Sequence, residues 1–547
     1  MPKKTFIYGA LILTIAGIVS KILGACFRIP LANMIGAEGM SYYQAAYPIY
    51  ILFLTISIAG FPVAVSRMVS EKIAFDDYHG AHRVFKVSFV VMGLLGLVLF
   101  SLLFFSADFI STHIKDLDGS VYAMKAIAPA LFFVTIMSAF LGYFQGMRNM
   151  MPSAIIQVTE QLFRVITGLM LAWYLLRQGK EYAAAGATFG ASAGSIAGFL
   201  VIIIIYAIAM RKDGVKDRIS DTSCCAAAGG TQTFGQITRT LFAIAVPITI
   251  GAAVMPIINL IDLPIVTDRL AASGWDSEAV RVLYGQLNGL AQPVINMPQI
   301  ITQSIAISLV PTIVIAFKKK DTEFLQYNVS LSIRTALILS LPCAAGIMVL
   351  AKPIMLLLYP LQRSDAIGAA PALFILAVGI IFLSLIQTLT GVLQGIGRQM
   401  IPVRNIAIGA ACKVVLTFVL TGIPSINIMG AAFGTVAAYF VAGVLNVHAA
   451  QKYTGTIVDW SRTLLRPLLA VLVMSAVVFS AYHLLSLAFG NAIAAIAAII
   501  LGAVSYVIFI FVFRAITAEE LALFPKGEFL VKIYRKVLTR TSKQGKM

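Results

Sequence analysis

The sequence predicts an all-α, polytopic membrane protein of about 14 transmembrane helices, with two pseudo-symmetric six-helix lobes and two further helices at the C-terminal end. The first reason is composition. The 547 residues are 60% hydrophobic and only 12% charged, whereas soluble domains carry about 25% charged residues. The second reason is that long apolar stretches recur along the whole chain, and the third is that segments of its first half return in its second half.

Each apolar stretch is long enough to cross a bilayer, which takes about 20 mostly apolar residues. The stretches lie at about 6–27, 42–66, 84–107, 122–146, 153–176, 183–210, 239–262, 282–316, 326–351, 369–396, 402–422, 427–450, 464–487 and 490–514. The eighth contains Pro293, Pro298 and Pro311, so we expect that span to be kinked or broken.

Short segments of the first half return about 249 residues later in nearly constant register. The matched pairs are Leu141–Gly146 with Thr390–Gly395, Pro152 with Pro402, Arg164 with Lys413, and Gly186–Gly190 with Gly430–Gly434. Because each copy contains six spans, both lobes enter the membrane in the same direction. Two such apolar halves, with a substrate path between them, are typical of membrane transporters.

The repeat predicts the domain boundaries. We expect an N-lobe at 1–210, a cytoplasmic linker at 211–238, a C-lobe at 239–450, two additional spans at 451–514 and a basic cytoplasmic tail at 515–547. The linker is basic at its start and then rich in small residues, a composition that suits a flexible connector.

Lysine and arginine are distributed unevenly between the two sides of this topology. With the N-terminus inside, cytoplasmic segments hold about 28 of the 41 cations and external segments about 8. This asymmetry predicts that both termini are cytoplasmic. It also accounts for most of the net charge of +18, because the excess cations lie in cytoplasmic segments. Since the cations are scattered over short loops, we expect a lipid bilayer and no nucleic acid as partner.

Two cations occupy matched positions inside predicted spans. Arg164 and Lys413 each lie eleven residues into their spans, which is about 17 Å deep. A charge there costs at least about 2.5–3.5 kcal/mol, so it usually faces a cavity or a partner. Two cations at one central cleft would suit a diphosphate or another polyanion. Alternatively, each is neutralised within its own half: Glu160 lies one turn before Arg164, whereas the sequence of Lys413's span holds no acid.

Three further charged residues are candidates for the substrate path. Lys21 lies past the middle of the first span and could line the cleft or extend its ammonium to the interface. Arg28, at the outer end of that span, could also line the cleft or be interfacial. Asp262, at the outer end of the seventh span, could bind Na⁺ or H⁺ and couple it to transport, or Asp262 could be a boundary residue. Glu160 is a second candidate for ion coupling.

No enzyme is predicted, because the sequence contains no P-loop, no metal-ligand cluster and no nucleophile motif in a suitable context. We therefore expect no cofactor and no metal site. The energy source would be an ion gradient, the membrane potential or the gradient of the substrate itself.

Several short motifs together carry a family resemblance. They are Ser20–Gly24, Ile35–Gly39, Gly60–Ser66, and Tyr284–Gly285 with Ser308–Pro311. Over essentially the whole chain the sequence resembles the polysaccharide-flippase branch of the multidrug/oligosaccharidyl-lipid/polysaccharide (MOP) superfamily. Within that branch it is most similar to the MurJ-type lipid II flippases and the stage V sporulation protein B group.

The resemblance implies two lobes in a V around a cationic cavity. It also implies that an undecaprenyl-pyrophosphate-linked cell-wall precursor is flipped from the inner to the outer leaflet of a bacterial plasma membrane by alternating access. Lys21 matches a cation of the family and Arg28 falls within one position of a second. The family's cation in the eighth span has no match, because this chain has Gln286, Asn288 and Gln292 there.

Other functions remain open at this stage. The substrate could be another lipid-linked polysaccharide unit, with a vegetative or a sporulation role. A drug or cation antiporter of the same superfamily would need an acidic cavity, but this chain has more cations than acids in its spans. A scaffold that recruits wall-synthesis enzymes would tolerate loss of the buried cations. We expect the chain to act as a monomer.

Overall fold

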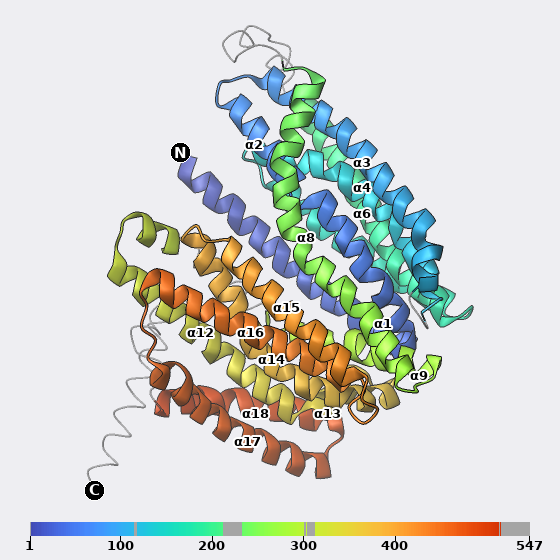
Figure 1. Ribbon diagram of the computed structural model, residues 1–547, viewed down its shortest axis with the longest axis vertical. Coiled ribbons are helices and arrows are strands. Elements are labelled where there is room, and N and C mark those ends of the chain that lie inside the picture. Colours follow the sequence, from blue (N-terminus) through green and yellow to red (C-terminus); the bar gives the residue numbers. More distant parts are fainter. Residues whose placement is uncertain are drawn as a thin grey trace. The chain divides into compact units, whose positions relative to one another are not determined.

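The computed structural model describes residues 2–113, 117–211, 232–299, 302, 312–513 and 515, and every regular element among them is a helix (Figure 1). The α-helices are α1 (Pro2–Ile58), α2 (Phe61–Ile73), α3 (Tyr78–His113), α4 (Ser120–Gly146), α5 (Met151–Leu175), α6 (Lys180–Arg211), α8 (Phe234–Ala272), α9 (Ser277–Tyr284), α10 (Gln292–Asn296), α12 (Thr322–Val349), α13 (Ala351–Leu358), α14 (Arg363–Gly395), α15 (Met400–Thr421), α16 (Met429–Thr454), α17 (Arg466–Ala488) and α18 (Asn491–Val512). Two π-helical stretches, η2 (Gly285–Ala291) and η3 (Ser461–Leu465), join neighbouring α-helices. The prediction of an all-α fold is confirmed.

Among the described residues, 12 helices are long and apolar enough to cross a membrane. The first of them covers 59 residues, Ile15–Ile73, nearly three times the roughly 20 residues that one crossing needs. Up to residue 296 the predicted eighth span consists of α9, η2 and α10 in direct succession, and the kink or break at its prolines stays a prediction. The helices therefore agree with about 14 transmembrane segments in a multi-pass membrane protein.

The start of the chain differs from the prediction. The expected gap between the first two spans, residues 28–41, is helical, and α1 continues to Ile58 with a bend at Gly36. Gly36 has φ 69° and ψ −174°, a conformation that is essentially restricted to glycine. The second span, expected to run to residue 66, is instead interrupted before Phe61, where Pro62 lies at the first turn of α2.

The helices form two compact units, unit 1 (Met1–Leu290) and unit 2 (Ala291–Met547). Helix α8, expected to open the second lobe, packs in unit 1 against α1, α2 and α3. A side chain on Gly60 would collide with the Ala245 carbonyl of α8, and the rings of Phe61 and Phe242 meet edge to face at 5.5 Å. The predicted lobe boundaries stay a prediction, and most of the predicted linker and tail lies outside the described residues.

The sequence repeat corresponds to repeated local structure. Helix α4 ends at Gly146 and α14 at Gly395. Each end is closed by the same bond: the Asn149 amide donates to the Phe144 carbonyl at 2.9 Å, and the Arg398 amide to the Leu393 carbonyl at 2.8 Å. In both cases a residue just after the helix has a left-handed φ, as is common at helix C-termini.

The repeated glycines lie where two helices meet. On α6, Gly186, Gly190, Gly194 and Gly198 recur every four residues and face α5 or its neighbours. A Cβ on Gly190 would lie 2.6 Å from the Arg164 carbonyl oxygen. In unit 2, a Cβ on Gly434 of α16 would lie 3.2 Å from the Lys413 carbonyl oxygen of α15. The matched residues thus face each other across equivalent helix pairs.

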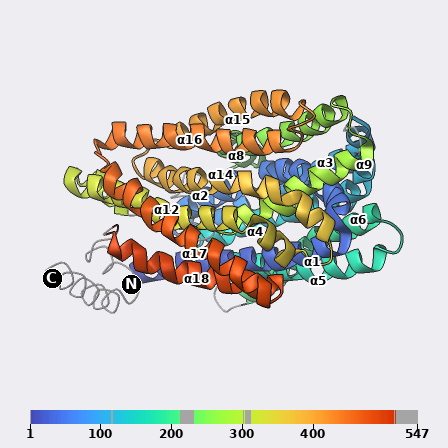
Figure 2. The ribbon, with the colours of Figure 1, turned by 90° about the horizontal axis from the view of Figure 1, so that it is seen from below.

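The last two helices, α17 and α18, lie side by side in unit 2 (Figure 2) and pack on α12 and α13. Hydrogen bonds between side chains and carbonyls fix them. The Tyr506 hydroxyl donates to the Ile338 carbonyl at 2.7 Å, and the Asn491 amide to the Pro353 carbonyl at 3.1 Å.

We expect Gly190→Ala to destabilise the protein, because a methyl group at 2.6 Å from the Arg164 carbonyl oxygen must push α6 away from α5. Overpacking of this kind costs about 1–3 kcal/mol. The matched control is Gly346→Ala in α12, where a Cβ meets nothing within 4 Å. Thermal unfolding of the two purified variants should show a lower midpoint for Gly190→Ala alone, and equal midpoints would contradict this account of the helix contact.

Candidate substrate-binding site in unit 1

The candidate site lies where α1 and α5 pack against each other in unit 1. Two small residues of α1 face glutamines of α5: the Ser20 hydroxyl donates to the Gln157 carbonyl at 3.3 Å, and a Cβ on Gly24 would lie 3.5 Å from Gln161 Nε2. Two helical turns further along α5, the ring of Phe27 packs on Gly168. The contact between α1 and α5 thus runs past Lys21 and Arg28 on one helix and Glu160 and Arg164 on the other.

Arg28 is held by uncharged groups. Its Nη2 donates to Gln44 Oε1 at 2.9 Å, and its Cζ lies 5.9 Å from the centroid of the Tyr47 ring, within cation–π range. The Tyr43 hydroxyl also interacts with it. No described carboxylate forms a salt bridge with Arg28. Its guanidinium is partly buried, and within the described part of the chain no acid pairs with it.

The bend at Gly36 makes these contacts possible. Arg28 and Gln44 are 16 residues apart on α1, which in a straight helix would place their backbones about 24 Å from each other. With the bend, the side chains meet, and the rings of Phe27 and Tyr43 approach to 6.2 Å. Gln44 is itself fixed, because its Nε2 donates to the Asn288 carbonyl of η2 at 2.5 Å.

Three tyrosines connect Arg28 to Arg164. Tyr43, Tyr47 and Tyr50 follow the bend at helical spacing, with ring centroids 5.7 Å apart in the first pair and 6.2 Å in the second. All three interact electrostatically with Arg164. Tyr43 and Tyr50 are buried, and Tyr43 interacts with both guanidinium groups.

Arg164 differs from Arg28 because an acid lies near it. Glu160, one turn earlier in α5, interacts electrostatically with Arg164, and both residues are partly exposed. Among the described contacts the two do not form a direct ion pair. Neutralisation of Arg164 by Glu160 stays a prediction.

Ion pairs hold the bend of α1 to neighbouring helices. Glu38, two residues after Gly36, pairs with Lys180 at the start of α6 at 2.9 Å and with Arg281 of α9 at 3.4 Å. Packing supports the same position, since a side chain on Gly285 would collide with the Ala37 carbonyl. The bend is therefore fixed on two sides.

Of the six residues expected from the sequence, four lie along the contact between α1 and α5. They are Lys21, Arg28, Glu160 and Arg164. The Lys21 side chain is exposed there. Asp262 lies on α8, where it interacts electrostatically with the buried Tyr284 of α9. Lys413 lies on α15 in unit 2, partly exposed.

Sequence reasoning missed the uncharged partners of the cations. Gln44 and the three tyrosines were visible only as an aromatic-rich second span. The spacing of Tyr43, Tyr47 and Tyr50 places them on one helix face, which could have suggested a wall. Their contact with Arg28 could not be found, since it depends on the bend at Gly36.

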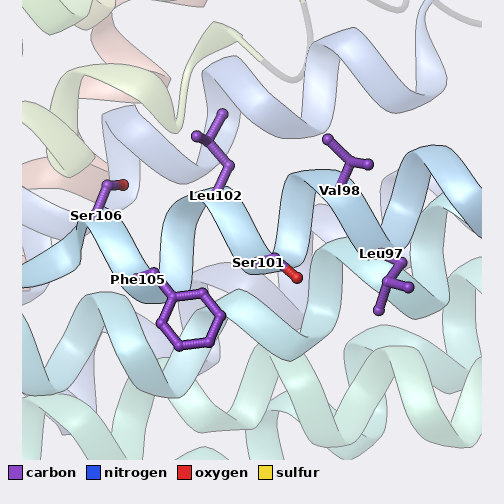
Figure 3. Close-up of a pocket in the computed structure, with 6 residues that line it drawn as sticks. All are labelled: Leu97, Val98, Ser101, Leu102, Phe105 and Ser106. Carbon is purple, nitrogen blue, oxygen red and sulfur yellow. The ribbon is translucent and has the colours of Figure 1, made fainter.

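A shallow apolar groove of about 620 Å³ lies elsewhere in unit 1, on α3 (Figure 3). Its lining consists of Leu97, Val98, Ser101, Leu102, Phe105 and Ser106. No charged residue lines it, and its large apolar side chains are exposed, as expected for a surface that meets acyl chains. It is not the predicted cationic cavity.

Comparison with known proteins identifies the family. Residues 6–317, more than half of the chain, match the family described as polysaccharide biosynthesis protein. The chain belongs to this family. It is 30% identical to stage V sporulation protein B of Bacillus subtilis over 531 residues, which cover 96% of this chain and 98% of that protein. It is also 30% identical to lipid II flippase MurJ of the same organism over 467 residues, 82% of each chain.

A solved structure shares the fold of this family member. Lipid II flippase MurJ in an inward closed conformation superposes with a TM-score of 0.67 and 17% identity, over 92% of this chain and 98% of that one. Family and fold together place this polysaccharide biosynthesis protein among the flippase-type membrane transporters of the MOP superfamily, as its motifs predicted.

We expect Glu38→Gln to destabilise this family member by about 1–2 kcal/mol, because two cations lose a partly buried acid as partner. Glu71→Gln is the matched control. It breaks the i,i+4 ion pair with Arg67. The side chain of Glu71 is 58% exposed and that of Arg67 65%, so the change should cost at most about 0.5 kcal/mol. The readout is the unfolding midpoint of each purified variant. A control that lost as much stability as Glu38→Gln would disprove the role of the Glu38 ion pairs.

Proposed function

We propose that this protein moves an undecaprenyl-pyrophosphate-linked cell-wall precursor, such as lipid II, from the inner to the outer leaflet of the bacterial plasma membrane. The observation that carries the proposal is the surrounding of Arg28. Inside a predicted membrane helix, the partners of this guanidinium among the described residues are an amide, a hydroxyl and an aromatic face. A charge inside the hydrocarbon is costly unless it faces a cavity or a partner, and the partner that complements a guanidinium is an anionic ligand.

Pyrophosphate fits the chemistry of this site. Arginine binds phosphate oxygens through two parallel hydrogen bonds, and these charge-assisted bonds are stronger than neutral ones. Lys21 and Arg164, along the same helix contact, would bind further phosphate oxygens. We propose that Lys413 of unit 2 supplies another cation for the diphosphate. The long lipid tail would remain in the bilayer while the lobes alternate between inward and outward access.

The two acids would link transport to an ion. Protonation of Glu160, or Na⁺ binding to it, would remove the charge that opposes substrate binding near Arg164. Asp262 is the second candidate for ion coupling. In the proposed topology both termini lie in the cytoplasm, and the protein acts as a monomer that uses an ion gradient or the membrane potential without a cofactor.

The charge of the site also argues against the antiporter alternative. A cationic drug would need acids along its path, whereas three of the four candidate residues between α1 and α5 are cations. The relatives named stage V sporulation protein B and lipid II flippase MurJ support a lipid-linked glycan as substrate. Lipid II and other lipid-linked polysaccharide units share the anionic diphosphate.

Complementation tests the proposed substrate. In a bacterium whose own lipid II flippase can be shut off, we expect the wild-type chain to restore growth and Arg28→Ala to fail at equal membrane levels. Loss of one charged hydrogen-bonding partner costs about 1.5–3 kcal/mol, or about 10–100-fold in binding. Arg177→Ala is the control, because Arg177 is an exposed cation of the same unit outside the site, and it should restore growth.

The alternatives give different results in this experiment. A well-expressed wild-type chain that does not restore growth would direct the search to another lipid-linked glycan. Rescue by Arg28→Ala as good as that by the wild type would show that the substrate does not depend on Arg28, and the proposed site would be wrong.

A second prediction concerns Gln44, which positions Arg28. We expect Gln44→Glu to weaken binding of inorganic pyrophosphate to the purified protein about 10–100-fold, because a carboxylate 2.9 Å from the guanidinium would neutralise it. Gln44→Met keeps the size and adds no charge, so its effect should be smaller. Titration calorimetry measures both variants, and equal losses would mean that the charge of Arg28 is not what binds the anion.

A further inference from the structure

Unit 2 contains a chain of uncharged polar side chains that the cationic site does not use. The polar chain consists of Thr302, Gln387, Gln299 and Asn296. The Thr302 hydroxyl donates to Gln387 Oε1 at 3.0 Å, Gln387 Nε2 donates to Gln299 Oε1 at 2.9 Å, and Gln299 Nε2 donates to Asn296 Oδ1 at 2.8 Å. Two side chains of the eighth predicted span, Thr302 and Gln299, thus bond Gln387 of α14, and the third, Asn296, bonds Gln299.

The polar chain lies at membrane depth. Asn296 follows the start of its predicted span by about 14 residues, or about 21 Å, and Gln387 follows the start of its own by about 18 residues, or about 27 Å. Both distances fall within a hydrocarbon core of about 30 Å. Amide side chains are rarely placed against lipid, so a connected set of them indicates a polar path.

Burial decreases from one end of the polar chain to the other. Thr302 is buried, Gln299 and Gln387 are partly buried, and Asn296 is exposed. The three hydrogen bonds donate in the same direction along the polar chain, so the Asn296 amide is the last group and its NH₂ does not take part in them. The polar chain therefore presents a directed amide donor at its exposed end, with no charged group among its members.

We propose that the polar chain binds the uncharged sugar of the lipid-linked glycan, through the hydroxyl and N-acetyl oxygens of a hexosamine. This proposal rests on the proposed function and names the part of the headgroup that unit 2 recognises. Neutral amides suit a sugar, because they exchange hydrogen bonds with hydroxyl and amide groups at little desolvation cost. A phosphate would favour the cations instead.

The same geometry argues against a metal ion as the ligand. The carboxamide oxygens of Gln299, Gln387 and Asn296 each already accept a hydrogen bond within the polar chain. A cation such as Na⁺ would need several oxygens that converge on one point, whereas these oxygens are spread along the polar chain, each accepting from a different donor. A sugar needs only the exposed end.

Two soluble probes separate this proposal from the proposed function. The full-length protein in nanodiscs would be tested with N,N′-diacetylchitobiose, a neutral hexosamine disaccharide, by saturation-transfer NMR, and with inorganic pyrophosphate by calorimetry. We expect Gln387→Leu to weaken disaccharide binding at least about tenfold and to leave pyrophosphate binding unchanged. Arg28→Ala should do the reverse. Thr390→Val on α14 is the matched control, since that hydroxyl bonds only its own helix at 2.7 Å.

A second variant covers the case in which Gln387→Leu does not fold. Asn296→Leu changes the exposed end, and Gln299 retains a bond to the Ile295 carbonyl at 3.4 Å, so the fold should persist while disaccharide binding falls. The proposal is overturned if the wild type does not bind the disaccharide, if Asn296→Leu binds it as well as the wild type, or if Na⁺ binds in its place. Loss of pyrophosphate binding in the wild type would count against the proposed function alone.

Discussion

The candidate site depends on one backbone bend, at Gly36 of α1. A straight helix would hold Arg28 and Gln44 about 24 Å apart, whereas the bend brings their side chains to 2.9 Å. Glycine is needed because φ is 69° and ψ is −174°. The ion pairs of Glu38 and the close packing of Gly285 on the next residue then keep the two segments of α1 in place. A conformational requirement at a single residue thus decides which side chains can surround the cation.

The surroundings of a buried cation decide what it can bind. An arginine paired with a carboxylate is stabilised, but its field at a distance is largely cancelled. Amide oxygens, hydroxyls and aromatic faces stabilise the guanidinium by smaller amounts and leave its charge intact. Arg28 has uncharged partners of this second kind. Arg164 is intermediate, because Glu160 is near but forms no direct ion pair with it among the described contacts. The contrast explains why Arg28 carries the functional argument.

Local patterns predicted the fold well and the site in part. Long apolar stretches and the repeat predicted an all-α membrane protein, the ends of α4 and α14, and the matched positions of Arg164 on α5 and Lys413 on α15. Each of these features depends on residues close in sequence or on a repeated helix contact. The helical course of residues 28–41 was not predicted, because Gly36 and Gly39 look like a loop when tertiary packing is unknown; the backbone at Gly36 is non-helical, so α1 consists of two helical segments joined by a kink. The partners of Arg28 were missed for the same reason.

The internal repeat also explains how one scaffold carries two kinds of chemistry. Close packing at Gly190 and Gly434 fixes the backbones of α5 and α15 in equivalent local contacts, so few changes to the backbone are tolerated there. Side chains that point away from those contacts are not restricted in this way. Unit 1 has cations and tyrosines along α1 and α5, whereas unit 2 joins amides of the eighth predicted span to α14. A headgroup with a charged part and a neutral part would need both kinds of surface.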